Sequence, residues 1–277
     1  MAISTIDGVI AGMQPPRPFA KAVTPTLVAG RPHSLWYLGG APGTGTADTS
    51  TGGGVARTSS STMVNGQIPH TDPVSGNSYL ARFQAQATIA GTLMLCDRLW
   101  DCGAVITPAT LSVTSTAAQT ITSVAWPARD TAASTNGNGV LLGIEVSAAL
   151  GVGTPTWTLT YTNQAGTGSR TATNLDPVVA SSAIGAFYRI GLQAGDTGVR
   201  SVQTFTSSAT ATSGQFVIVA YRVLASLELT AANTPNAVDA LTSGFPRLPN
   251  GVVPFLIFVP STTTASNISG TYVEAQG

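Results

Sequence analysis

The chain has 277 residues, enough for one large domain or two modest ones. Twelve basic and twelve acidic residues cancel, and charged residues make up 9% of the chain, against about 25% in an average soluble protein. A net charge of zero argues against a nucleic-acid-binding protein, which would have a basic stripe, and against a polybasic membrane-surface protein. A hydrophobic fraction of 43% argues against wholesale disorder.

The composition favours β-structure. Threonine is the commonest residue with 40 copies, while 30 Gly, 17 Pro and only three Glu leave few good helix formers. A surface of Thr, Ser, Ala and Gly loses little hydration free energy on burial, because hydroxyls pair readily and no full charge is desolvated. We therefore expect a protein that works packed against neighbouring molecules.

The first 80 residues are rich in Pro and Gly and predict an extended N-terminal arm. The glycine-rich stretch 39–54 within it predicts a flexible loop. Residues 4–13 predict one short helix capped by Ser4 or Thr5. Its predicted apolar face is made by Ile6, Val9, Ile10 and Met13.

The arm also contains large apolar and basic side chains that such a segment cannot bury by itself. We expect these side chains to bind a partner protein. The candidates are Arg17, Phe19, Lys21, Arg31, Trp36 and Tyr37, with Leu27 as a further apolar anchor. The alternative is that the arm wraps the domain that follows it, and the sequence leaves both interpretations open.

From about residue 81 onward, β-strand patterns alternate with turns at roughly 8–12-residue spacing. In Val140–Ser147 the apolar alternation points Glu145 outward, and in Thr156–Thr162 it points Trp157 and Tyr161 inward. Gln215–Leu229 predicts one long strand or a bent pair. Further predicted strands are Phe83–Leu95, Gln119–Trp126, Arg170–Thr173, Ala186–Gln193, Val199–Thr206, Val252–Val259 and Ile268–Val273, with a minor helix around Asn236–Ser243.

These patterns amount to roughly eight to ten strands, the number found in jelly rolls and related double-sheet folds. The predicted fold class is all-β: an antiparallel, jelly-roll-like β-sandwich domain over 81–277, preceded by the arm over 1–80. Residues 231–277 are a candidate for a separately packed C-terminal segment.

The histidines and cysteines give little evidence of catalysis. His33 and His70 are the two histidines, and although His70 lies near Asp72, a G-x-S-x-G nucleophile elbow is absent from the sequence. Cys96 and Cys102 do not have zinc-ligand spacing. A disulfide between them is conceivable across the intervening turn, but two buried thiols are the commoner outcome for a chain made in the cytosol.

Other catalytic patterns are equally weak. Gly39–Thr46 has glycines but not the Lys-Ser/Thr ending of a phosphate loop, and no convincing acid–base pair is found around Glu145 or Asp130. We expect no enzymatic activity, no cofactor and no metal.

Targeting signals are also absent from the sequence. The opening residues do not form a signal peptide, and the longest apolar runs are far shorter than a membrane span. We expect synthesis in the host cytoplasm, with no membrane or nucleic-acid partner.

Four segments are similar to a known group of proteins. They are LMLCDRLWDCGAVITPATLSVTSTAAQTITSVAWPARDTAASTNGNGVLLGIEVS (Leu93–Ser147), LTYTNQAGTGSRTAT (Leu159–Thr173), LQAGDTGVRSVQT (Leu192–Thr204) and VIVAYRVLASLEL (Val217–Leu229). Together they resemble virion-associated proteins of tailed bacteriophages, over roughly Phe83–Leu229. The resemblance implies a structural component of the particle, built as a β-sandwich and present in many copies; the matching segments are scaffold patterns and imply no catalytic residue.

The expected function is therefore that of a virion protein. The leading expectation is a capsid decoration (cement) or minor capsid protein that binds the major capsid protein as a homo-oligomer, most plausibly a trimer. Two alternatives stay open: a neck, collar or tail structural protein, and a host-surface or carbohydrate-binding β-sandwich module.

Overall fold

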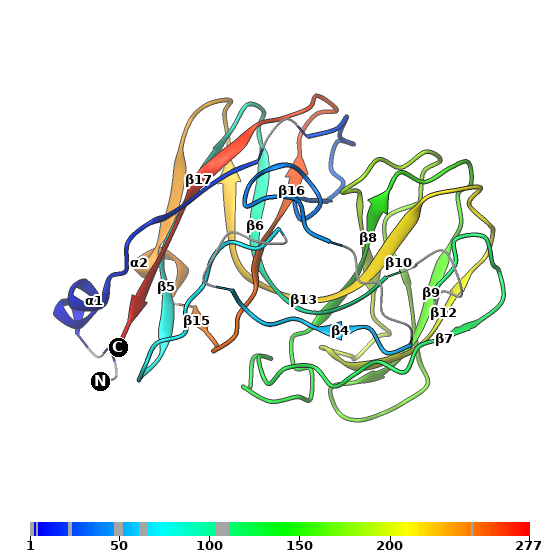
Figure 1. The fold of residues 1–277 in the computed structure, drawn as a ribbon, viewed down its shortest axis with the longest axis horizontal. Helices are drawn as coiled ribbons and strands as arrows, with labels where there is room; N and C mark the ends of the chain where they lie inside the picture. The colour runs from blue at the N-terminus through cyan, green and yellow to red at the C-terminus, as the bar shows by residue number, and fades with distance from the viewer. Residues whose placement is uncertain are drawn as a thin grey trace. The chain divides into compact units, whose positions relative to one another are not determined.

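The computed structural model describes residues 3, 5–21, 24–46, 52–60, 66–103, 111–244 and 246–277. It is 4% helix and 44% strand, and its sheets are antiparallel and curled, so the predicted all-β, sandwich-like fold class is confirmed. Figure 1 shows the strands, coloured from blue at the N-terminus to red at the C-terminus.

The chain divides into two compact units. Unit 1 comprises Met1–Gly45, Thr58–Asp97 and Val223–Gly277, and unit 2 comprises Thr46–Arg57 and Arg98–Arg222. Two of the four chain boundaries fall inside long strands, β6 (Gly91–Gly103) and β13 (Gln215–Leu229). This division differs from the one expected at residue 80, because residues 1–45 and all of 231–277 belong to one compact body.

Unit 1 contains a six-stranded sheet in which β5 and β17 are long central strands. The order is β14 (Asn236–Asp239), β5 (Ser78–Ala87), β17 (Ile268–Gln276), β1 (Arg17–Lys21) and β3 (Gly40–Ala41), with β15 (Arg247–Leu248) also paired to β5. The pairings are antiparallel, and β17 lies between β5 and β1 (Figure 1). The predicted arm therefore supplies two strands of this sheet.

Further strands of unit 1 are β2 (His33–Ser34) and β16 (Pro254–Pro260), which pair with each other, while β16 also pairs with β6. The core of unit 1 includes two aromatic contacts. The rings of Phe19 and Phe83 lie 6.0 Å apart, as do those of Trp36 and Phe255. Full burial of such side chains contributes roughly 1.5–3 kcal/mol each.

Unit 2 is built on a curled sheet. Its order is β13, β8 (Leu141–Ala148), β11 (Phe187–Gly191), β10 (Arg170–Asn174), β9 (Trp157–Asn163), β12 (Val199–Ser207) and β7 (Gln119–Thr120). The curl surrounds one apolar core, in which the Trp157 ring contacts the rings of Tyr188, Phe205 and Phe216. The short β4 (Val55–Ala56) pairs with the unit 2 part of β6.

Two helices are present in the described residues. Helix α1 (Ile6–Gly12) confirms the predicted N-terminal helix, and the Thr5 hydroxyl caps it by accepting the Gly8 N–H at 3.1 Å. Ser4, the other predicted cap, lies outside the described residues. Helix α2 is limited to Ala240–Ser243, because Asn236–Asp239 instead pair with β5 as strand β14.

Several predicted strands are confirmed with altered ends. The strand around Thr156–Thr162 is β9, with Trp157 and Tyr161 buried as expected, and Gln215–Leu229 is a single strand. Phe83–Leu95 is instead parts of two strands, β5 and β6, separated by a turn, and only Gln119–Thr120 of Gln119–Trp126 is a strand.

One side-chain orientation was predicted wrongly. Glu145 has no exposed surface, and its carboxylate is paired with the buried guanidinium of Arg98. An alternating pattern with one charged residue predicts a solvated face, but here an ion pair allows the carboxylate to be buried.

The described parts of the predicted flexible loop 39–54 are bonded to the rest of the chain. In unit 1 the Gly45 N–H donates to the carbonyl of Trp36 at 2.8 Å, and in unit 2 the Gly53 carbonyl accepts from the Trp100 indole N–H at 2.8 Å. Residues 47–51 of this stretch lie outside the described residues.

Candidate functional site

Uncharged side chains cover part of one side of the six-stranded sheet of unit 1. The exposed Arg82, two residues before Gln84 on β5 and opposite Val273 of β17, lies next to them on the same side. Strand pairing places the uncharged side chains in two rows that cross β1, β17 and β5: Pro18, Thr271 and Gln84 in one row, and Ala20, Ser269 and Gln86 in the other. We call the surface made by these six residues the outer face. All six are partly or fully exposed.

The outer face contains a hollow of about 430 Å³. Its walls and rim are Pro18, Gln84, Gln86, Ser269, Thr271 and, from the loop before β14, Pro235. Its floor is Phe19, Ala85 and Gly270, which lie between the two rows along the strands. No charged residue lines this hollow, and its volume is within the range of ligand sites.

Helix α1 lies on the same side of the sheet, beside the end of β17 (Figure 1). Its Val9, together with Ile3, packs against Ala81, Val273 and Ala275. Alternate residues of a strand share a face, so Val273 and Ala275 continue the line of Ser269 and Thr271. The hollow and α1 therefore occupy neighbouring parts of one surface.

The opposite side of α1 is apolar and exposed. Ile6 is 71% exposed, Ile10 is 66% exposed and Met13, just after the helix, is 45% exposed. The single apolar face predicted for this helix is thus divided: Val9 faces the sheet, and the other three residues face away from it. Exposed apolar residues grouped in this way are typical of interaction surfaces.

The partner-binding residues expected in the arm are placed differently. Phe19, Lys21, Arg31, Trp36 and Tyr37 are buried in unit 1, and Arg17 is mostly buried. The Lys21 ammonium donates to the carbonyls of Leu38 and Pro42 at 3.2 and 2.7 Å. These side chains are not available to a partner in this structure, which matches the alternative of an arm wrapped onto its own domain.

His70, the histidine nearest to a carboxylate in sequence, joins two carboxylates in unit 1. Its Nδ1 lies 2.7 Å from Oε1 of Glu274, and its Nε2 lies 3.1 Å from Oδ1 of Asp72. Both ring nitrogens are thereby occupied, whereas a catalytic triad needs one of them to face a hydroxyl. Burial, and then the Glu274 carboxylate, raise the pKa of nearby Tyr272 well above its usual range.

A second polar group is buried in unit 2. Arg98 donates from Nε to Oδ2 of Asp101 and from Nη1 to Oε2 of Glu145, both at 2.7 Å. Arg57 of the arm adds a bond from Nε to Oδ2 of Asp101 at 2.8 Å. These charges compensate one another inside the unit, and their arrangement is structural.

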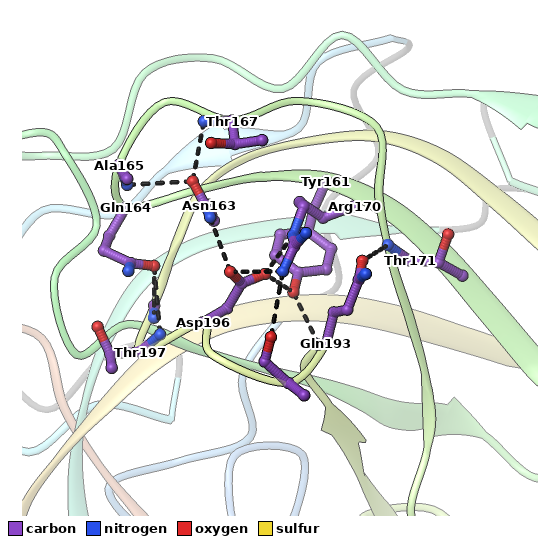
Figure 2. Close-up of polar contacts among 12 residues, drawn as sticks. Tyr161, Asn163, Gln164, Ala165, Thr167, Arg170, Thr171, Gln193, Asp196 and Thr197 are labelled. Carbon is purple, nitrogen blue, oxygen red and sulfur yellow. Dashed lines mark hydrogen bonds and ion pairs between the residues drawn. The ribbon is translucent and has the colours of Figure 1, made fainter.

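A third polar group joins two exposed turns of unit 2 around the carboxylate of Asp196 (Figure 2). Asp196 accepts from Tyr161 Oη at 2.5 Å, from Asn163 Nδ2 at 2.7 Å, and from Arg170 Nε and Nη2 at 2.8 and 3.0 Å. The Arg170 guanidinium, with the Tyr161 and Asn163 donors, holds the pKa of Asp196 well below its usual range. Desolvation and the bond to Asp196 raise the pKa of Tyr161 to about 12.

The same turns are braced by amide side chains. Gln164 accepts the N–H groups of Thr197 and Gly198 at 3.2 and 3.1 Å, and Asn163 accepts those of Ala165 and Thr167 at 3.1 and 2.9 Å (Figure 2). Asp196 and the two amides therefore hold residues 163–170 and 193–198 in one conformation while their tips stay exposed.

Cys96 and Cys102 are buried and are not disulfide-bonded, so the disulfide considered from the sequence is not formed. Both lie on β6, and six residues of extended strand separate their Cα atoms by roughly 20 Å, far beyond disulfide reach. Among the described residues, no group of three or more His, Cys, Asp and Glu side chains is placed to hold a metal ion.

The outer face was missed at the sequence level. A signal for it exists in the alternation FQAQA (83–87), which sets Gln84 and Gln86 opposite the buried Phe83 and Ala85. Ser269 and Thr271 alternate in the same way with the buried Ile268 and Tyr272. What the sequence does not show is that these segments pair with each other and with β1.

Comparisons with known proteins give no family for this chain. No protein-family model matches it, and no curated protein matches its sequence. A solved structure of a mutant VP2 protein of infectious bursal disease virus, in derived T=1 particles, is 10% identical, with 95% of this chain and 78% of that chain covered, at a TM-score of 0.15. This TM-score is too low to indicate a shared fold. In the part of the chain that the structure describes, no helix has the length and apolar character to cross a membrane.

Proposed function

We propose that this protein is a structural component of a tailed-bacteriophage virion, of the capsid decoration (cement) or minor capsid type. In this proposal it stabilises the head by binding the major capsid protein. The observation that supports this best is one surface of unit 1 on which an exposed apolar helix side, Ile6 and Ile10, borders an uncharged hollow.

Such a surface is suited to permanent contact with another protein. Burial of Ile6 and Ile10 gains roughly 1.5–3 kcal/mol each if they become fully covered. The amides and hydroxyls beside them are desolvated at low cost, because they carry no charge and can pair with the partner. When many copies bind one particle as oligomers, these moderate contacts add through multivalency.

The proposal includes assembly and location. The protein is made in the host cytoplasm and becomes part of the virion, as a homo-oligomer for which a trimer is favoured. Light scattering on the purified chain tests the trimer: three chains of 28.0 kDa give about 84 kDa. The neck, the collar and the tail are alternative positions on the particle, because a docking face of this kind would serve there equally.

A carbohydrate-binding module is the second candidate function. The braced turns of unit 2 support it, since exposed turns held rigid before binding lose less entropy when a ligand binds. Their exposed tips contain Thr, Ser, Gln and Gly. They contain no aromatic ring of the kind on which a sugar stacks, which counts against this candidate.

The docking proposal is tested by sedimentation with particles from which this protein has been stripped, prepared from a phage that encodes it. The wild-type chain is expected to co-sediment, and Ile6→Ser with Ile10→Ser is expected to lower the affinity at least about tenfold. Leu175→Ser is the matched control, because Leu175 is an apolar side chain of unit 2 with 63% exposure. Failure of the wild-type chain to bind, or equal losses in the two variants, would refute the proposal.

A further inference from the structure

The hollow on the outer face has the form of a trough that runs across the strands. Its two walls are neighbouring rows of side chains, two residues apart along each strand, which places them roughly 7 Å from one another. Its floor is the backbone between the rows, at Phe19, Gly270 and Ala85. A chain that lies over this floor has hydrogen-bonding side chains on both sides of it.

The chemistry of the walls matches a peptide backbone. Gln84 and Gln86 present amides, and Ser269 and Thr271 present hydroxyls, so each wall residue that hydrogen-bonds can both donate and accept. The Gln86 amide donates to the Ser269 hydroxyl at 3.4 Å, a long contact that a better partner can replace. The peptide backbone offers one N–H donor and one carbonyl acceptor per residue.

The ends of the trough and its charge restrict the occupant further. Pro18 and Pro235 give it apolar ends. No charged side chain lines the trough itself, and Arg82 lies beyond its wall at Gln84, so a charged group inside the trough would lose hydration without gaining an ion pair there. The part of the segment that lies in the trough is therefore expected to be uncharged.

The position of the trough favours a protein as the occupant. It borders α1, whose exposed Ile6 and Ile10 need an apolar partner surface. Its lining contains one aromatic residue, Phe19, which is 2% exposed and cannot act as a stacking platform for a sugar.

We propose that the trough binds an extended, uncharged segment of the coat protein, which lies across β1, β17 and β5 while α1 contacts an adjacent apolar patch. This inference rests on the proposed function, and it adds the chemical class of the segment that the outer face recognises. The trough supplies the hydrogen bonds that select the segment, and α1 supplies most of the buried apolar area.

The first test replaces the trough amides while leaving α1 unchanged. Gln84→Ala with Gln86→Ala is expected to weaken binding to stripped particles about tenfold, through the loss of hydrogen bonds to the segment. The control is Gln193→Ala, which removes an exposed amide from a turn of unit 2. The thermal midpoints of both variants are measured, so that any loss of folding is separated from a loss of binding.

The second test identifies the occupant. A photo-activatable residue in place of Gln86 is cross-linked on the particle, and the product is mapped by mass spectrometry. The expected product joins this position to one stretch of the coat protein that lacks Asp, Glu, Lys and Arg. A cross-link to a charged stretch, or displacement of the chain by a neutral oligosaccharide, would overturn the inference.

The two proposals fail in different ways. If the trough variant binds like wild type while the Ile6→Ser and Ile10→Ser variant loses affinity, the inference is wrong and the proposed function stands. If the wild-type chain does not bind the particle at all, both are wrong.

Discussion

Nη1 of Arg98 donates to Oε2 of Glu145 at 2.7 Å, and neither side chain has any exposed surface. Two charges have thus been removed from water inside unit 2, and they are stable there because they pair with each other and because Arg98 also pairs with the buried Asp101. Removing Glu145 leaves Arg98 with only Asp101, a carboxylate that it shares with Arg57, so the positive charges of the group are no longer balanced. The loss of folding free energy on removing one charge of such a buried pair is far larger than the net contribution of the intact pair to stability.

Glu145→Gln is therefore expected to destabilise the protein by about 3–5 kcal/mol in urea or guanidinium unfolding followed by tryptophan fluorescence. The matched control is Arg189→Met, which breaks the exposed ion pair with Asp176, in which Arg189 is 47% exposed. We expect less than about 1 kcal/mol from the control. Equal effects from the two variants would show that the Arg98–Glu145 pair is not buried as described.

The stability of unit 1 is expected to depend on pH through His33. Burial, and then the positive charge of Arg31, lower the pKa of His33 to about 4, while an unfolded chain has a histidine pKa of about 6.5. Between these values the unfolded state binds a proton that the folded state does not. The contribution of His33 to the free energy of unfolding is complete above pH 6.5. It decreases as the pH falls to 4, by about 3 kcal/mol in total.

His33→Gln is the variant that isolates this effect. In the wild type, His33 Nε2 accepts the Val28 N–H at 3.1 Å, and an amide oxygen can replace it as an acceptor that does not titrate. The unfolding free energy of the wild type minus that of the variant, measured from pH 8 to pH 4, should decrease by about 3 kcal/mol as the pH falls. A constant difference would contradict the assigned pKa.

The Asp196 carboxylate is expected to control the order of two turns of unit 2. Asp196→Ala removes the acceptor shared by Tyr161, Asn163 and Arg170 (Figure 2). Amide hydrogen exchange in residues 163–170 and 193–198 should become about tenfold faster or more, while exchange in β17 of unit 1 stays unchanged. Unchanged exchange in the two turns would show that the backbone alone holds them.

Cys96 and Cys102 are expected to resist thiol reagents until the chain unfolds. Both are buried, and burial raises the pKa of the Cys96 thiol well above its usual range, so little thiolate forms in the folded state. A colorimetric thiol assay should detect no fast-reacting group in the native protein and two groups in denaturant. A mass lower by two hydrogens, with no thiol detected after unfolding, would indicate a disulfide instead.

The strands could be predicted from sequence where one face is apolar and the other polar. In β9 the alternation of Trp157, Leu159 and Tyr161 with Thr residues defined the strand, its face and its ends to within one residue. Helix α1 was predicted for a similar reason, since a capping residue and apolar spacing both lie within a short segment.

Prediction failed where a partner distant in sequence decides the outcome. Glu145 was expected in water because Arg98, 47 residues away, is not apparent from a local pattern. The arm was expected to offer Trp36 and Tyr37 to another protein because Phe255 and the strands that cover them lie more than 200 residues later. The outer face has the same origin, because it forms only when residues 17–21 and 84–86 pair with the strand over 268–272.

Locating the protein on purified particles tests the central claim most directly. Antibody against this chain, detected with gold in electron microscopy, is combined with mass spectrometry of gradient-purified particles from a phage that encodes it. The account predicts that the chain is present in many copies and that gold labels the surface of the head. Particles that contain the coat protein but lack this chain would contradict it.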